Sequence, residues 1–276
     1  GTMLQWLPGS SRRLIIYNAR RGGHYVSVIH DIQNGEVRTL PLPTYTISHN
    51  GRYALTPNFS RLARTRPGYG YVGVPDRWAE EKAPKEDGIY WMDLETGEHR
   101  LIVSVGQMAD FHPKGDMKDY AHWFNHLLFS PDDRRFIFLH RWRPVIGRPF
   151  KTRLFTANPD GGDIYLVADD DLVSHFDWRD PAHILAWARK KELGNYYFLF
   201  TDRSDESQIV RQNILKSDGH CSYSPNRRWI LTDTYPDPEK KRSLLLYHLE
   251  TQRLMELGRF FSPPELSGEI RCDLHP

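Results

Sequence analysis

The chain of 276 residues repeats one short pattern along most of its length. Each copy starts at an apolar or aromatic residue and passes through a polar turn with one or two arginines. It ends in a run of about five or six β-branched or aromatic residues, which predicts a strand and not a helix. The five copies are WLPGSSRRLIIY (6–17), ISHNGRYALT (47–56), FSPDDRRFIFL (129–139), WRDPAHILAW (178–187) and YSPNRRWILT (223–232).

A second pattern follows each copy, in which two short apolar segments flank a polar turn, as in a β-hairpin. Together the two patterns give four antiparallel strands in each unit of roughly 40–50 residues, which is typical of a β-propeller blade. We therefore predict an all-β propeller with very little helix. The hairpin segments are VIHDIQNGEVRTL (28–40), YWMDLETGEHRLIV (90–103), FTANPDGGDIYLV (155–167), FLFTDRSDESQIV (198–210) and LYHLETQRLMEL (246–257).

The second and third copies are separated by about twice the usual spacing. We interpret residues 57–87 as a long insertion in the second blade, with a degenerate extra blade as the alternative. The last segment, RCDLHP (271–276), resembles the start of another inner strand. The prediction is a single propeller domain over residues 1–276, with about five blades and a stub, incomplete at its C-terminus.

Composition excludes several classes of protein. Lys plus Arg number 37 and Asp plus Glu 35, so a net charge of +2 argues against a nucleic-acid-binding protein. Two cysteines, Cys221 and Cys272, make neither a disulfide framework nor a zinc motif. No apolar run is long enough to cross a membrane, and no signal peptide is visible at the N-terminus, so a cytoplasmic location is expected. The oligomeric state is left open.

Histidines recur at one level of the repeat. Because inner strands line the channel of a propeller, these side chains are expected to point at the axis, close enough to share a metal ion or an anionic substrate. The alternative is that they are structural residues copied with the repeat. The four are His126, His175, His220 and His275.

Cations gather around the loop that follows the third middle strand. Guanidinium groups bind carboxylates through two parallel hydrogen bonds, so this loop suits an acidic sugar. We predict substrate-binding roles for Arg141 and Arg143, and for His140 beside them; a solvated loop is the alternative. The other cations of the loop are Arg148, Lys151 and Arg153.

Residues 120–276 resemble the oligogalacturonate lyases, which are polysaccharide lyases with seven-bladed propellers related to TolB-type propellers. The resemblance rests on the order of five motifs and implies seven blades in the full protein. The motifs are His-x-x-Phe-Ser-Pro-Asp (126–132), Arg-Leu-Phe-Thr-Ala-Asn-Pro-Asp-Gly (153–161), Ser-His-Phe-Asp-Trp (174–178), Gly-His-Cys-Ser-Tyr-Ser-Pro (219–225) and Leu-His-Pro (274–276).

The resemblance also implies site residues. The family's catalytic arginine matches Arg153, and two of its metal-binding histidines match His220 and His275. Its metal segment differs here, with Ile270 in place of a glutamine and Asp273 in place of a histidine. Asp273 or Glu269 would then supply an oxygen ligand. Mn²⁺ is the expected metal, with Zn²⁺ or Ca²⁺ as alternatives.

The implied reaction is β-elimination on a uronate-containing oligosaccharide, as in pectin degradation. An arginine base is chemically difficult because the guanidinium pKa is above about 12. His175 and His126 are the rival acid–base candidates. Two other functions remain open: a non-catalytic propeller that binds a glycan or a protein, and a propeller hydrolase.

Overall fold

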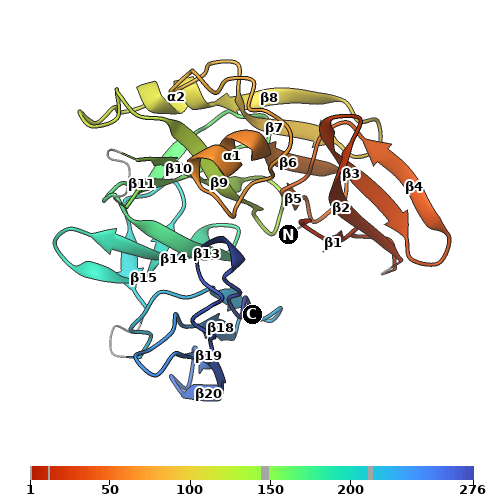
Figure 1. Cartoon of the computed structure of the whole chain (residues 1–276). Helices are drawn as coiled ribbons and strands as arrows, with labels where there is room; N and C mark the ends of the chain where they lie inside the picture. The colour runs from red at the N-terminus through yellow and green to blue at the C-terminus, as the bar shows by residue number, and fades with distance from the viewer. Residues whose placement is uncertain (1, 12, 144–148, 211–213) are drawn as a thin grey trace. The chain divides into compact units, whose positions relative to one another are not determined.

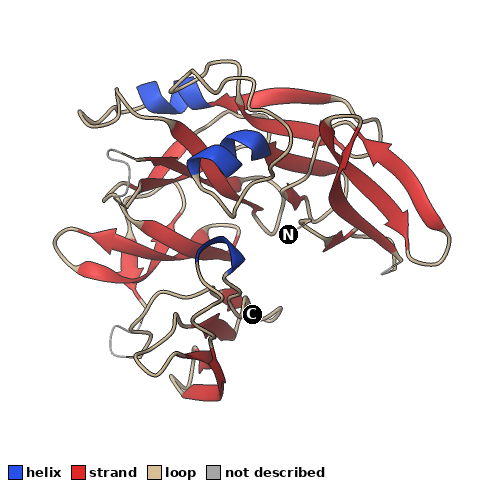
Figure 2. Ribbon diagram, viewed as in Figure 1, coloured by secondary structure: helices blue, strands red, loops and turns tan. Residues whose placement is uncertain are grey.

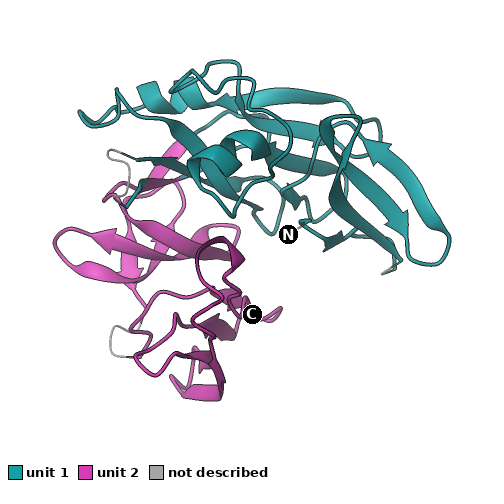
Figure 3. Cartoon of the chain, viewed as in Figure 1, with its two compact units in different colours: residues 1–151, 155–164 teal, residues 152–154, 165–276 magenta. Residues whose placement is uncertain are grey.

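The computed structural model describes residues 2–11, 13–143, 149–210 and 214–276. The chain forms two compact units (Figure 3). Unit 1 comprises residues 1–151 and 155–164, and unit 2 comprises residues 152–154 and 165–276. Strands dominate both units (Figure 2), and they form five four-stranded antiparallel sheets, which confirms the predicted all-β propeller fold.

Every sheet is a meander in which each strand pairs only with its neighbours along the chain (Figure 1). Three sheets lie before residue 170. The first consists of β1 (Gln5–Trp6), β2 (Leu14–Arg21), β3 (His24–Asp31) and β4 (Gly35–Leu40). The second consists of β5 (Thr46–Ile47), β6 (Tyr53–Pro57), β7 (Gly88–Asp93) and β8 (His99–Ser104). The third consists of β9 (His122–Phe129), β10 (Phe136–Trp142), β11 (Lys151–Ala157) and β12 (Tyr165–Ala168).

Two further sheets belong to unit 2. One consists of β13 (Val173–Asp180), β14 (His183–Lys190), β15 (Gly194–Thr201) and β16 (Ser207–Ile209). The other consists of β17 (Ser222–Tyr223), β18 (Trp229–Asp233), β19 (Lys241–His248) and β20 (Leu254–Phe261). The innermost strand varies most among the blades, from eight residues in β9 and β13 to two in β1, β5 and β17.

Each unit has an apolar core between neighbouring sheets, because alternate strand residues point to opposite faces. In unit 1, Ile16 and Ile29 of the first sheet pack with Ala54 and Met92 of the second. In unit 2, residues from both sheets form one buried cluster. Its members are Leu185, Trp187, Tyr197, Leu199, Leu215, Cys221, Tyr223, Ile230 and Tyr247.

Residues 58–87 connect β6 to β7 and include helix α1 (Phe59–Thr65). Asn58 caps this helix, since its side chain accepts a hydrogen bond from the backbone N–H of Arg61 at 3.0 Å.

A second long connection, which the sequence analysis did not predict, follows β8 and starts with α2 (Val105–Asp110). It begins with a capping box in which Ser104 and Gln107 satisfy each other's backbone N–H groups.

Residues 271–276 form no strand, contrary to the predicted inner strand. After the short 3₁₀ helix η1 (Gly268–Ile270), this segment is held by contacts to the last sheet, since Arg242 of β19 donates to the carbonyl of Cys272.

Among the described residues, no helix has the length and apolar character needed to cross a membrane.

Candidate functional site

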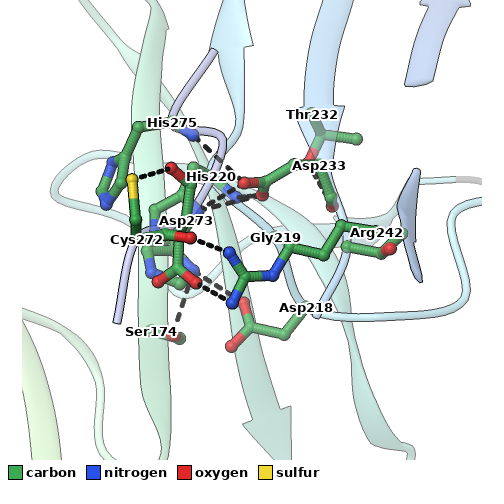
Figure 4. A network of polar contacts seen from close by, with 12 residues as sticks. Ser174, Asp218, Gly219, His220, Thr232, Asp233, Arg242, Cys272, Asp273 and His275 are labelled. Atoms are coloured by element: carbon green, nitrogen blue, oxygen red, sulfur yellow. Dashed lines mark hydrogen bonds and ion pairs between the residues drawn. The ribbon is translucent and has the colours of Figure 1, made fainter. Parts of the chain in front are cut away.

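Three of the four predicted inner-strand histidines meet in unit 2, and Figure 4 shows two of them, His220 and His275, with the carboxylates of Asp233 and Asp273. The ring centroids of His175 and His220 are 4.0 Å apart, and those of His220 and His275 are 3.6 Å apart. His175 belongs to β13, His220 lies two residues before β17, and His275 belongs to the C-terminal segment. Residues from three successive repeats therefore make one imidazole cluster.

His220 is fixed by the carboxylate of Asp233 at the end of β18. Nδ1 of His220 lies 2.9 Å from both carboxylate oxygens, and the backbone N–H of His220 donates to Oδ1 at 2.7 Å. The Asp233 side chain is 1% exposed. Because a carboxylate only accepts hydrogen bonds, Nδ1 carries the proton, and Nε2 is the ring nitrogen with a lone pair for a ligand.

Gly219 allows the backbone before His220 to lie against β18. A Cβ at this position would overlap the carbonyl oxygen of Asp233 and lie 2.8 Å from Oγ1 of Thr232. Tyr197 holds the same turn, because its hydroxyl donates to the carbonyl of Gly219 at 2.7 Å. The sequence Asp218-Gly219-His220 therefore combines a close backbone approach with two polar side chains of the site.

His175 lies in a β-bulge of its strand. Val173 pairs with Ala188 and Phe176 with Ala186, so two residues of β13 face the single residue Trp187. Nδ1 of His175 is 2.9 Å from Asp218 Oδ1 and 3.1 Å from Ser174 Oγ. Since the serine and the aspartate approach the same ring nitrogen, this group lacks the geometry of a Ser-His-Asp relay, in which they occupy opposite nitrogens.

Asp273 brings a carboxylate to the cluster, between two arginines. Arg242 Nη2 forms an ion pair with Oδ1 at 3.0 Å, and Arg271 Nη2 donates to Oδ2 at 2.8 Å. Oδ1 is buried and accepts no well-aligned hydrogen bond from the described residues. The backbone N–H of His275 donates to Asp233 Oδ2 at 3.2 Å, so Asp233 holds two histidines of the cluster.

The residues present fit a divalent metal ion. Ligand atoms of His220, Asp273 and His275 all lie within 4.8 Å of one another. Two imidazole nitrogens and one carboxylate oxygen suit Zn²⁺ or Mn²⁺ better than Ca²⁺, which prefers oxygen ligands throughout. Glu269, the other predicted oxygen ligand, lies on the exposed η1 and is not part of this group.

The pKa values of the cluster reflect its burial and its charges. Burial alone would raise the pKa of Asp233, but the hydrogen bonds from the ring and backbone of His220 bring it below its ordinary value. Burial lowers the pKa of His275, as does the charge of His220, while Asp273 and Asp233 act in the opposite direction.

We predict that the stability of the chelator-treated protein depends on pH through His275. The pKa of His275 in the folded chain is lowered from 6.5, its value in the unfolded chain. At a pH between the folded and the unfolded pKa, the folded chain therefore binds fewer protons at this residue than the unfolded chain. The contribution of His275 to stability is therefore complete above pH 6.5 and is lost as the pH falls through the folded pKa. Urea denaturation of the wild type and His275→Gln at several pH values measures it. An NMR titration that placed the His275 pKa at or above 6.5 would contradict the prediction.

Arg153 is fully buried on β11. Burial lowers the pKa of its guanidinium, whereas the carboxylates of Asp169 and Asp171 raise it. The environment therefore moves the pKa in the direction that a base needs. The carboxylates of Asp169 and Asp171 favour the charged guanidinium, however, and so oppose a role as a base.

The remaining predicted residues lie in unit 1. His126 occupies a β-bulge of β9 with φ at +52°, and its Nδ1 is 3.0 Å from the hydroxyl of Tyr45. His140 is fully buried, with Nε2 2.9 Å from Nδ1 of His122, so it presents no surface to a substrate. The predicted substrate-binding role of His140 does not fit this position.

The cationic loop is only partly described. Arg141 is 2% exposed, and its guanidinium lies over the ring of Phe150 at 4.6 Å. Arg143 is half-buried. Lys151 forms an ion pair with Asp116. Arg148 lies outside the described residues.

Sequence analysis missed the carboxylates that orient the histidines, Asp218 and Asp233. The position of Asp233 opposite His220 could have been predicted from the register of the two strands. In the antiparallel pair β17–β18, Ser222 faces Leu231 and Tyr223 faces Ile230, and extending this register by two residues places Asp233 opposite His220. Asp218 had a weaker signal, since it stands two residues before His220 but contacts His175 from the previous blade.

Comparison with known proteins identifies the fold and no more. The β-propeller domain of the trilobed protease from Pyrococcus furiosus is 13% identical with a TM-score of 0.53, and covers 89% of this chain and 67% of that one. The acylaminoacyl peptidase from Pyrococcus horikoshii is 12% identical with a TM-score of 0.51, and covers 86% of this chain and 36% of that one. TolB from Acinetobacter baumannii is 13% identical with a TM-score of 0.49, and covers 89% of this chain and 51% of that one.

The chain thus spans about half of the TolB chain and little more than a third of the peptidase. No protein-family model matches it, and neither does any curated protein. The likeness to the β-propeller domain of the trilobed protease supports the β-propeller fold of this chain, and none of the three proteins named above is an oligogalacturonate lyase.

Proposed function

We propose that unit 2 carries a divalent-metal-dependent lyase site that cleaves uronate-containing oligosaccharides by β-elimination. The observation that carries the proposal is the group formed by His220, Asp273 and His275, in which a buried carboxylate orients one imidazole and two arginines orient the acidic ligand. The resemblance of residues 120–276 to oligogalacturonate lyases supports the choice of substrate. Mn²⁺ remains the first candidate for the metal.

The reaction needs three things from the site. The uronate carboxylate must be neutralised so that the proton on the adjacent C5 becomes acidic, and a bound divalent cation supplies this Lewis acidity. A base must then remove the C5 proton, and the C4–O bond breaks to leave a C4–C5 double bond. The departing oxygen takes up a proton, which completes the cleavage.

His175 is the better placed base. Its side chain is 13% exposed, its ring lies 4.0 Å from that of His220, and the contact of Asp218 with Nδ1 orients the ring. Arg153 has no exposed surface, and a general base must come within hydrogen-bond distance of the proton that it removes. The geometry therefore supports His175 over Arg153.

The test is an assay of the full chain with di- and trigalacturonate, following the ultraviolet absorbance of the unsaturated product. We expect activity with Mn²⁺, none after chelation, and a loss of at least about 100-fold in His175→Gln with metal binding unchanged. His183→Gln is the matched control, because His183 also pairs with an aspartate, at 2.8 Å, but is the first residue of β14 and is not part of the cluster.

Bound metal without cleavage of any uronate would disprove the lyase and favour a non-catalytic propeller that binds a glycan or a protein. A hydrolysed product without the double bond would instead favour a hydrolase, although Ser174 and Asp218 at one nitrogen of His175 do not support that chemistry.

A further inference from the structure

Unit 1 contains a cavity of about 440 Å³ that the lyase site does not use. Residues of the segment 58–87 and of the first two sheets line it. The cavity wall is rich in aromatic and proline rings, which come from β3, β6, β7, the connection between β4 and β5, and the segment 58–87 with its helix α1. These rings are Tyr25, Phe59, Trp78 and Tyr90, with Pro41, Pro43, Pro57 and Pro75.

Asp87 is the fully buried acidic residue of this wall. Its Oδ2 accepts a hydrogen bond from Asn58 Nδ2 at 2.9 Å, and its Oδ1 has no hydrogen-bond partner among the described residues. A buried carboxylate oxygen without a partner is costly to the fold. Its position on a cavity of ligand size indicates a binding function.

The charge of Arg61 acts on Asp87, but its guanidinium forms its hydrogen bonds and its ion pair with other groups. Arg61 donates its hydrogen bonds to the carbonyls of Glu81, Lys82 and His122 at 2.6–2.9 Å, and to that of Trp78 at 3.2 Å. Its ion pair is formed with a different carboxylate, Asp76, at 3.6 Å, and Arg64 also pairs with Asp76 at 3.1 Å. Within the described part of the chain, no cation forms an ion pair with Asp87.

We propose that this cavity binds an organic ammonium ion, with ionised Asp87 as its counter-ion and the aromatic rings against its alkyl groups. The faces of aromatic rings carry negative potential, so a carboxylate and several rings attract a cation together. Trp78 already shows this property, because the exposed guanidinium of Arg77 lies 5.4 Å from its ring centroid.

Binding should depend on pH. Burial raises the pKa of Asp87 to about 6, against the opposing effects of the Asn58 hydrogen bond and the Arg61 charge. Asp76 adds to the rise. Since protonated Asp87 carries no charge, affinity for an ammonium ion falls as the pH drops through about 6.

Other titratable groups also face the cavity. His24, His99 and Arg77 also lie on its wall. The charge of Glu86 acts on the neighbouring Tyr90. The variant Asp87→Asn isolates the contribution of Asp87, because any pH dependence that remains in it comes from other groups.

The test is calorimetric titration of the full chain with choline and with its uncharged carbon isostere, dimethylbutanol. We expect choline to bind at least about tenfold more tightly than the isostere, and Asp87→Asn to remove most of that difference. Glu86→Gln, which removes an exposed charge next to Asp87, should change choline binding by less than about twofold.

Equal affinity for the two probes, or no choline binding, would overturn the proposal. Preferential binding of neutral sugars in a parallel titration would also overturn it. If Asp87→Asn fails to fold, Trp78→Leu is the second variant, with choline affinity expected to fall several-fold through loss of the ring face. Unchanged choline binding in Trp78→Leu would likewise count against the ammonium site.

Discussion

Replacing His220 with alanine is expected to weaken Mn²⁺ binding by at least about 100-fold and to abolish lyase activity. His220 contributes the imidazole at the centre of the cluster, with ring centroids 4.0 Å from His175 and 3.6 Å from His275. Without it, Asp273 and His275 are the only members of the ligand group left among the described residues. Metal analysis of the purified variant and Mn²⁺ titration measure the loss.

Two further variants test whether the loss of metal affinity is specific to the His220 ligand. Asp233→Asn keeps the shape of the side chain but removes the charge that fixes Nδ1 of His220, so metal affinity should fall by roughly 10–100-fold. His183→Ala removes another aspartate-bound histidine of unit 2 and should leave metal binding unchanged. Wild-type Mn²⁺ affinity in His220→Ala would disprove the ligand assignment, whatever the activity.

Gly219→Ala is expected to destabilise the protein by roughly 3 kcal/mol, at the upper end of overpacking effects. The added methyl group would overlap the carbonyl oxygen of Asp233, and this is backbone that cannot rotate away. Relief requires the turn to move, which would break the hydrogen bonds between His220 and Asp233. The variant should therefore lose both stability and metal affinity, measured by urea denaturation and by Mn²⁺ titration.

Gly115→Ala is the matched control, because Gly115 is exposed and a Cβ there meets nothing within 4 Å. Its midpoint of denaturation should stay close to that of the wild type. If the two alanine variants lost stability equally, the close approach at Gly219 would not be the cause.

The blades could be predicted from sequence because the information that specifies them is local. A hairpin such as β14–β15 needs only two alternating strands and a turn, and Gly194 with φ at +103° supplies the turn geometry. The structure differs from the prediction at segments whose backbone conformation is set by tertiary packing. Helix α2 and the irregular backbone of residues 271–276 follow from contacts that no local pattern records.

The candidate site was predictable to the level of its histidines. Their recurrence in the repeat indicated His175, His220 and His275, but burial and partner choice are set across blades. The recurrence does not separate His175, oriented by Asp218 at the cluster, from His126, whose Nδ1 lies beside the hydroxyl of Tyr45 in unit 1. Arg153 likewise matches a motif, yet its full burial results from packing around β11.

The two-residue strand β17 has a consequence for how the site opens. Residues 214–221 precede it outside any sheet ladder, and the amide of His220 is held by the side chain of Asp233 instead of by a neighbouring strand. Local opening of this segment therefore leaves the hydrogen bonds between β18 and β19 intact. Amide hydrogen exchange at His220 should be much faster than in β18, and its slowing by Mn²⁺ would report occupancy of the site directly.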